Sequence, residues 1–169
     1  YRGWEFLVDS FEASDELLER SHWWTRIRAP YKAASSVRFQ LRPAGWTARA
    51  LRLLGGPWSR YFRTGYPEVD RLVAIRTGSE RELLSNPTIR KMLTDVGPID
   101  LDIAEVFEER VSPIRERIEE LRFRERGRIA DADRLIALVE LLAEMLDRLQ
   151  EMGVAKRRDR SVYSPSGED

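Results

Sequence analysis

The stretch that decides the fold is Asp131–Gly153, with the sequence DADRLIALVELLAEMLDRLQEMG. Its apolar residues recur at steps of three and four, a spacing that places them on one face of a helix. These residues are Leu135, Leu138, Val139, Leu142, Met145, Leu146, Leu149 and Met152. Asp131 or Asp133 can cap the start of the helix, and Gly153 can end it. Because Ile136 and Leu141 widen the stripe, the helix needs a broad apolar cover.

The residues before this helix supply that cover as short segments in which apolar and polar side chains alternate, the pattern of β-strands. The expected strands lie at residues 3–12, 23–29, 37–41, 69–76, 99–103 and 121–129. We expect the first three to form an antiparallel meander, with residues 33–36 as the hairpin between the second and third. Pro30 should limit the second strand.

Shorter helices are expected between the strands. Residues 46–58 form an amphipathic piece that Gly55, Gly56 and Pro57 should end. A broken helix follows, starting at Ser79 and restarting with Asn86 as N-cap. Residues 105–117 are interpreted as an arm or a broken helical turn.

Together, the expected strands and helices predict an α+β fold. A mostly antiparallel sheet of about six strands carries the long C-terminal helix and the shorter broken helix on one face. Residues 1–155 form a single domain, and residues 156–169 form a disordered polar tail.

Composition excludes several classes of site. The 169 residues include no cysteine and one histidine, His22. A disulfide framework, a cysteine nucleophile and a multi-histidine metal site are therefore excluded. We expect no catalytic residue, no cofactor and no metal. No apolar run reaches the length of a membrane span, and because the chain opens at Tyr1 and not at a methionine, the expected membrane anchor would precede Tyr1.

Charge is unevenly distributed along a chain whose net charge is zero. From Arg20 to Pro67 there are ten basic residues and no acidic one. From Glu68 to Glu120 there are thirteen acidic and eight basic residues. A neutral total thus hides one basic and one acidic segment.

Three motifs carry a resemblance. Arg26–Tyr31 reads RIRAPY, Gly65–Asp70 reads GYPEVD, and Ser85–Arg90 reads SNPTIR. Their order over residues 1–155 resembles a bacterial family of unknown function whose members often carry a hydrophobic anchor before this domain. The resemblance implies no activity and no catalytic residue. The chain departs from the family at residues 105–117.

Basic and aromatic side chains interleave in the acid-free segment. Such segments are attracted to anionic lipid surfaces. The candidate binding residues are Arg26, Arg28, Arg38, Arg42, Arg49, Arg52, Trp46, Trp58, Arg60 and Arg63. Nucleic acid would use the same residues, with bases stacking on the aromatics. In a purely structural alternative, Trp23, Tyr31 and Phe39 face the core, and the arginines pair with Asp100, Asp102 and Glu125.

The functional expectation is a non-enzymatic binding or assembly domain of a bacterial membrane-associated protein, in the cytoplasm at the inner face of the membrane. Its partner would be an anionic membrane surface or another protein, with nucleic acid as the alternative. The helix at 131–153 could also form a homo-oligomer contact. A third hypothesis is an enzyme using Asp100 and Asp102, which lie about 7 Å apart on one strand face.

Overall fold

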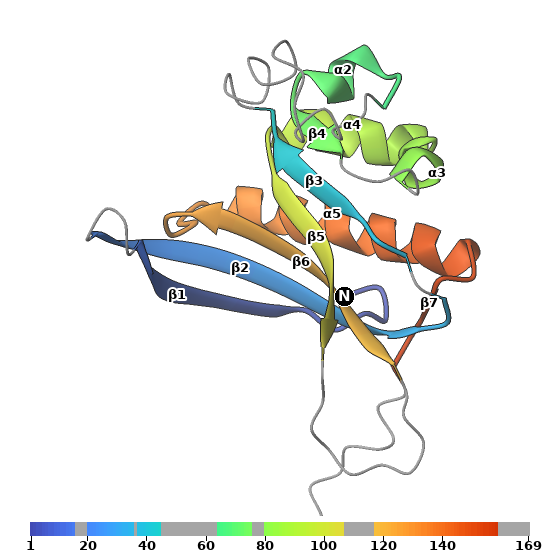
Figure 1. Ribbon diagram of the computed structural model, residues 1–169, viewed down its shortest axis with the longest axis horizontal. Helices are drawn as coiled ribbons and strands as arrows, with labels where there is room; N and C mark the ends of the chain where they lie inside the picture. The colour runs from blue at the N-terminus through green and yellow to red at the C-terminus, as the bar shows by residue number, and fades with distance from the viewer. Residues whose placement is uncertain (16–19, 36, 45–63, 76–79, 107–116, 159–169) are drawn as a thin grey trace, which may run out of the picture.

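The structure is a computed structural model that describes residues 1–15, 20–35, 37–44, 64–75, 80–106 and 117–158. The expected helix at 46–58 and most of the expected arm at 105–117 lie outside these residues. The described part is an α+β fold in which an antiparallel sheet carries a long C-terminal helix (Figure 1). The predicted fold class is confirmed.

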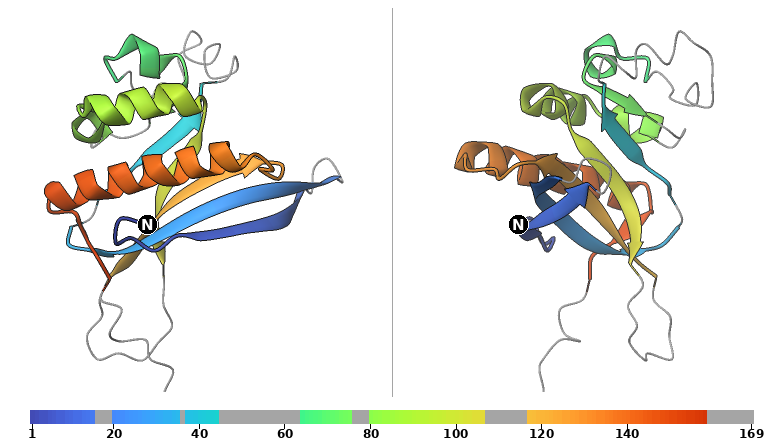
Figure 2. Two further views of the ribbon diagram at one scale, coloured as in Figure 1. Left: turned by 180° about the vertical axis from the view of Figure 1, so that it is seen from behind. Right: turned by 60° about the vertical axis from the view of Figure 1, so that its left-hand side comes forward.

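The sheet has the strand order β1-β2-β6-β5-β3-β4, with β7 pairing to β2, and every pair is antiparallel. The strands are β1 (Leu7–Asp15), β2 (Arg20–Ala33), β3 (Gln40–Pro43), β4 (Val73–Ile75), β5 (Asp100–Val106), β6 (Ile118–Arg126) and β7 (Ala155–Lys156). The helices are α2 (Pro67–Asp70), α3 (Glu80–Leu84), α4 (Pro87–Val96) and α5 (Ala132–Glu151). Figure 2 shows α5 crossing the back of the sheet, with α4 beside it.

Helix α5 is the element that the apolar stripe predicts. Asp131 caps it, because its Oδ1 accepts hydrogen bonds from the backbone N–H groups of Asp133 at 3.0 Å and Arg134 at 3.4 Å. Its buried residues are Leu138, Leu141, Leu142, Ala143, Met145, Leu146 and Leu149. Gly153 follows the helix with φ of +72°, a conformation that glycine adopts without steric cost. The predicted start and stop signals are confirmed.

Helix α4 begins where its sequence signals place it. Asn86 Oδ1 accepts from Thr88 N at 2.8 Å and from Ile89 N at 3.4 Å, with Pro87 in the first turn. Ile89, Leu93 and Val96 are buried, and Gly97 at φ +87° ends the helix. These contacts confirm the prediction for this helix.

The predicted three-stranded meander is wrong. Strands β1 and β2 do pair, but the other neighbour of β2 is β6, and β3 pairs with β4 and β5. The core-facing residues of β2 and β6, such as Ile27 and Phe123, are opposite one another and form the apolar floor under α5. Because β6 and β5 lie between β2 and β3 in the sheet, β2 and β3 do not form the predicted hairpin.

Pro30 does not end β2, contrary to expectation. Gly127 N donates to Trp23 O at 2.6 Å, so odd-numbered residues of β2 direct their backbone groups toward β6. Even-numbered residues, including Pro30, then point toward β1. Pairing with β1 ends at Arg28 and pairing with β7 begins at Lys32, so the missing N–H of Pro30 lies in the gap between these two partners, where a proline is tolerated.

Three element boundaries in the structure differ from the predicted ones. The first strand begins at Leu7, and the buried Trp4 precedes it. Val69 belongs to α2, and the fourth strand begins only at Val73. Lys156, where the polar tail was expected to begin, pairs with Lys32 in β7, and residues 159–169 lie outside the described residues.

Candidate functional site on the open sheet face

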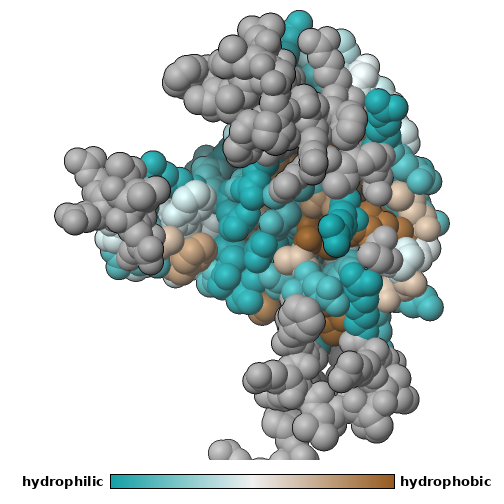
Figure 3. All heavy atoms as spheres, viewed as in Figure 1, coloured by the Kyte–Doolittle hydropathy of each residue, from teal (hydrophilic) through white to brown (hydrophobic). Residues whose placement is uncertain are grey.

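The candidate site is the sheet face opposite α5, here called the open face. Side chains alternate between the two faces along a strand. On β2 and β6, Ile27 and Phe123 are buried under the helix, whereas Arg26 and Arg124 lie half-buried on the open face. Figure 3 views this face and shows a continuous hydrophilic band across its middle. The charged side chains of β1, β2, β5 and β6 pair with one another on this face.

Four arginines occupy the centre of the open face. Arg26 is opposite Arg124, and Arg28 is opposite Arg122, in the β2–β6 ladder. We call these four residues the arginine square. Their side chains keep 26–30% of their surface exposed. Like charges directly opposite one another on a sheet are destabilising, so this arrangement needs compensation from neighbouring strands.

On one side the compensation comes from Asp9 of β1. Arg26 donates to both carboxylate oxygens, from Nε at 3.0 Å and from Nη2 at 2.9 Å. Arg28 Nη2 adds a third bond at 2.8 Å. The hydrogen bonds from Arg26, together with the charges of both arginines, lower the pKa of Asp9 below its ordinary value. One carboxylate thus faces two guanidinium groups.

On the other side, the compensating carboxylates are Asp102 and Asp100 of β5. Arg122 binds Asp102 in a bidentate pair, with both N–O distances at 2.9 Å, and Arg124 Nη2 donates to Asp102 at 3.3 Å. Asp100 pairs with Arg42 of β3 and lies 3.6 Å from Arg124. Burial raises the pKa of Asp100 despite these arginines, so desolvation outweighs their attraction. Asp100 and Asp102 are therefore held as partners of the arginines.

Some buried polar atoms of this charge network, in the described part of the chain, have no hydrogen-bond partner. Glu120, 8% exposed, lies beside the square opposite Pro30 and Ala104. In the part of the chain that the structure describes, the buried Nε atoms of Arg28 and Arg124 lack an acceptor, and Asp100 Oδ1 lacks a hydrogen-bond donor. Unsatisfied buried polar groups are costly and call for a specific explanation. Counting Arg42 with the square, five arginines face Asp9, Asp100, Asp102 and Glu120.

An aromatic group borders the square toward the β1–β2 turn. Phe11 is opposite Trp24 in the β1–β2 ladder, and Trp24 is opposite Arg126 in the β2–β6 ladder. Arg126 Nη2 contacts the imidazole of His22, at 2.6 Å from Nε2, and Arg26 stacks 4.9 Å from the centre of the Phe11 ring. We call Phe11, His22, Trp24 and Arg126 the aromatic corner. None of these four residues is acidic.

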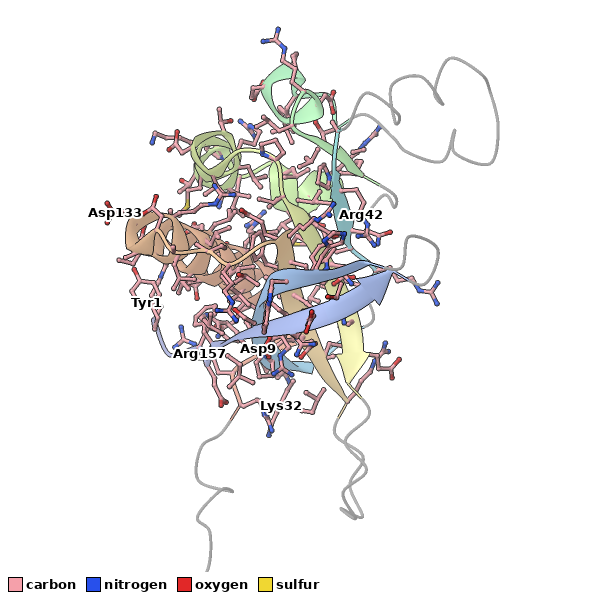
Figure 4. The ribbon with its side chains drawn as sticks, turned by 90° about the vertical axis from the view of Figure 1, so that its left-hand side faces the viewer. Tyr1, Asp9, Lys32, Arg42, Asp133 and Arg157 are labelled. Carbon is pink, nitrogen blue, oxygen red and sulfur yellow. The ribbon has the colours of Figure 1, made fainter. Side chains whose placement is uncertain are left out.

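The structure brings some of the predicted binding residues together. Arg26 and Arg28 share Asp9 on the open face, Arg42 lies on the same face beside Asp100, and Figure 4 shows Asp9 and Arg42 on this sheet, with Lys32 toward its lower end. Arg38 is exposed, two residues before β3. The other predicted binding residues lie outside the described residues: Trp46, Arg49, Arg52, Trp58, Arg60 and Arg63.

The structural alternative from the sequence is correct in part. Tyr31 and Phe39 are buried, and Arg42 meets Asp100 as that alternative expects. Trp23 is 43% exposed, which corrects its placement in the core. It lies on the helix side of β2, but the β1–β2 hairpin extends past the end of α5 (Figure 2), and Arg128 stacks on its ring at 3.9 Å. Glu125 pairs with Arg134 of α5 rather than with a β2 arginine.

Sequence reasoning missed the contribution of β6. Arg122, Arg124 and Arg126 alternate with Phe123 and Glu125, so the sequence does indicate that the three arginines share one strand face. It does not indicate that this face adjoins Arg26 and Arg28, because that pairing joins segments about a hundred residues apart.

Neither a metal centre nor a membrane-spanning helix is found in the described residues. Among the described residues, no group of three or more histidine, aspartate or glutamate side chains could hold a metal ion. In the same part of the chain, no helix is long and apolar enough to cross a membrane. Comparisons with protein-family models, with curated proteins and with solved structures find no match to this chain. The resemblance described above therefore rests on its three motifs alone.

Proposed function

We propose that this chain is a non-enzymatic binding domain whose open face engages the anionic surface of a bacterial membrane from the cytoplasmic side. The observation that carries the proposal is the arginine square, in which Arg26 and Arg28 lie opposite Arg124 and Arg122. With Arg42, five guanidinium groups face four carboxylates on this sheet, so the open face keeps an excess of positive charge that attracts anionic lipids.

The chemistry of arginine favours phosphate as the group that is bound. A guanidinium group presents donors in a planar fork that matches phosphate oxygens, and it stays charged at every physiological pH. Arg26 binds Asp9 with two of its donors, whereas Arg28 binds the same carboxylate with Nη2 alone. The guanidinium group of Arg28 therefore has further N–H donors for a phosphate. A lipid phosphate would offset the excess positive charge.

The aromatic corner fits the same partner. Tryptophan and phenylalanine side chains next to cations are suited to the boundary between headgroups and acyl chains, where one part of the site is wet and the other apolar. Trp24 and Phe11 are partly exposed beside Arg126. The acid-free segment at residues 20–67 contains β2 and β3, and its further basic residues would add to the attraction.

Vesicle co-sedimentation tests the proposal. Vesicles of phosphatidylcholine with phosphatidylserine should retain the protein at low salt and release it as salt rises, because screening weakens the attraction. Vesicles of phosphatidylcholine alone should not retain it. Equal and negligible retention by both preparations contradicts the proposal.

A second candidate function is binding of single-stranded nucleic acid. The specific observation in its favour is the Phe11–Trp24 pair on an open antiparallel sheet, since bases stack on such aromatic platforms. A gel shift with single-stranded DNA and RNA at low salt decides between the candidates. Retardation of the oligonucleotide without vesicle binding would favour nucleic acid, and vesicle binding without retardation would favour the membrane.

A further inference from the structure

The outer edge of β1 has no backbone partner among the described residues. β1 is the terminal strand of the sheet and pairs with β2 alone. It is nine residues long, whereas β4 at the opposite end has only three. Short edge strands, prolines and charged side chains, lysine above all, are the usual protection against edge-to-edge pairing. The β1 sequence LVDSFEASD contains neither proline nor lysine.

The direction of the free backbone groups follows from the neighbouring ladder. Even-numbered residues of β2 point toward β1, because the odd-numbered Trp23 bonds to Gly127 on the β6 side. Their partners in β1 are odd-numbered, such as Asp9 opposite Arg26 and Phe11 opposite Trp24. The N–H and C=O groups of Val8, Ser10 and Glu12 therefore point away from the sheet.

We propose that β1 is a homodimer interface, in which two copies pair antiparallel about a twofold axis at Phe11 and join their sheets into one. This register uses all nine residues of the strand. Val8 lies opposite Ser14 of the second copy, and Ser10 lies opposite Glu12, so the outward backbone groups bond to each other. Phe11 then faces Phe11 of the second copy as a non-hydrogen-bonded pair, where side chains approach most closely.

Charge supports a second copy of the chain as the occupant. In the register centred on Phe11, every acidic position of β1 faces a neutral one: Asp9 faces Ala13, Glu12 faces Ser10, and Asp15 faces Leu7. A register centred on Glu12 would instead oppose Glu12 to itself and Asp9 to Asp15. Asp9 is also neutralised within its own chain by Arg26 and Arg28. The acidic residues thus select one full-length register and do not prevent pairing.

Exposed apolar surface supports the same interface. Leu7 is 40% exposed and Val8 is 49% exposed, on opposite faces of the strand. Both would lose contact with water beside the second copy, which is the main driving force for association. The dimer would also bring two aromatic corners together at the twofold axis. The inference stands on the β1 edge and does not depend on what the open face binds.

Light scattering after gel filtration tests the dimer over a concentration series. The wild-type protein should show twice the chain mass of 19.7 kDa. Ser10→Pro removes an outward N–H without touching the β1–β2 ladder, and it should give the monomer mass with an unchanged circular dichroism spectrum. Ser10→Ala is the matched control and should remain dimeric. A monomeric wild-type protein, or a Ser10→Pro variant that stays dimeric, overturns the proposal.

The register has its own test, because the chain contains no cysteine. Phe11→Cys should form a disulfide-linked dimer on mild oxidation, since opposed Cα atoms in a non-hydrogen-bonded pair lie about 4.5 Å apart. Ala13→Cys should not, because its copies would lie about 13 Å apart along the strands. Cross-linking of Ala13→Cys, or none with Phe11→Cys, overturns this register whether or not the Ser10→Pro variant folds.

Discussion

Tyr31 donates its phenolic hydrogen to Glu119 Oε2 at 2.8 Å, inside the core. The two residues are opposite one another in the β2–β6 ladder, and Glu119 is 2% exposed. Arg117 Nη2 lies 2.7 Å from the other carboxylate oxygen, Oε1. A buried carboxylate is tolerated only when it is paired and hydrogen-bonded, so the phenol and the guanidinium together make Glu119 compatible with the core.

Tyr31→Phe should lower the free energy of unfolding by about 2 kcal/mol, because it leaves a buried carboxylate oxygen without its donor. Urea unfolding followed by circular dichroism measures the loss. In a double-mutant cycle, adding Glu119→Gln to Tyr31→Phe should cost less than Glu119→Gln alone costs in the wild type. Strictly additive losses would contradict a direct coupling of the two side chains.

Alkaline stability provides a second prediction. Burial, reinforced by Glu119, raises the pKa of Tyr31 far above its ordinary value. A folded-state pKa above the unfolded one contributes stability that is complete below the unfolded pKa, about 10 for tyrosine, and is lost as pH rises toward the folded value. The free energy of unfolding should therefore fall more steeply above about pH 10 in the wild type than in Tyr31→Phe. Identical slopes would show that Tyr31 ionises normally in the folded protein.

Asp9 contributes to the loss of folding stability at acid pH. Its pKa is lowered first by the hydrogen bonds from Arg26, so its contribution to stability is present above the unfolded pKa and is lost as pH falls through the lower folded pKa. Asp9→Asn should flatten the loss of stability below about pH 4. At neutral pH the cost should stay below about 1 kcal/mol, because the pair is partly exposed.

Trp4 ties the N-terminal residues to α5. It is 2% exposed, and its Nε1–H donates to Asp147 Oδ1 at 2.8 Å. Trp4→Ala should lower the free energy of unfolding by about 3–5 kcal/mol, as expected for loss of a large buried aromatic side chain. Trp4→Phe should cost less, because the ring volume is largely kept and only the bond to Asp147 is lost. A Trp4→Ala loss below about 1 kcal/mol would mean that the residue is not part of the core.

Local signals in the sequence predicted local structure correctly. Asn86 with Pro87 and Asp131 with its apolar stripe predict helix starts, because a cap acts on backbone groups only two or three residues away. The α+β class follows from the same periodicities. Burial of Tyr31 and exposure of Arg26 follow from alternation along one strand.

Long-range pairing could not be derived in the same way. Gln40 of β3 pairs with Asp102, and Arg26 pairs with Arg124, so contacts across sixty to a hundred residues decide which strands are neighbours. Trp23 was placed in the core because its strand face is the core face, yet α5 does not reach the end of the β1–β2 hairpin. The arginine square depends on the long-range pairing of β2 with β6, and only its β2 half, Arg26 and Arg28, belongs to the predicted binding residues.

The measurement that tests the central claim most directly is vesicle affinity of two variants with the same change in charge. Arg28→Gln/Arg126→Gln alters the open face and leaves the bidentate Arg26–Asp9 pair in place. Arg81→Gln/Lys91→Gln removes two exposed cations from α3 and α4.

Each basic residue near an anionic lipid surface contributes about 1 kcal/mol, so the open-face variant should bind phosphatidylserine vesicles about 30-fold more weakly than the wild type. The helix variant should bind as the wild type does. Equal loss in both variants, or no loss in the open-face variant, would contradict the assignment of the open face as the binding surface.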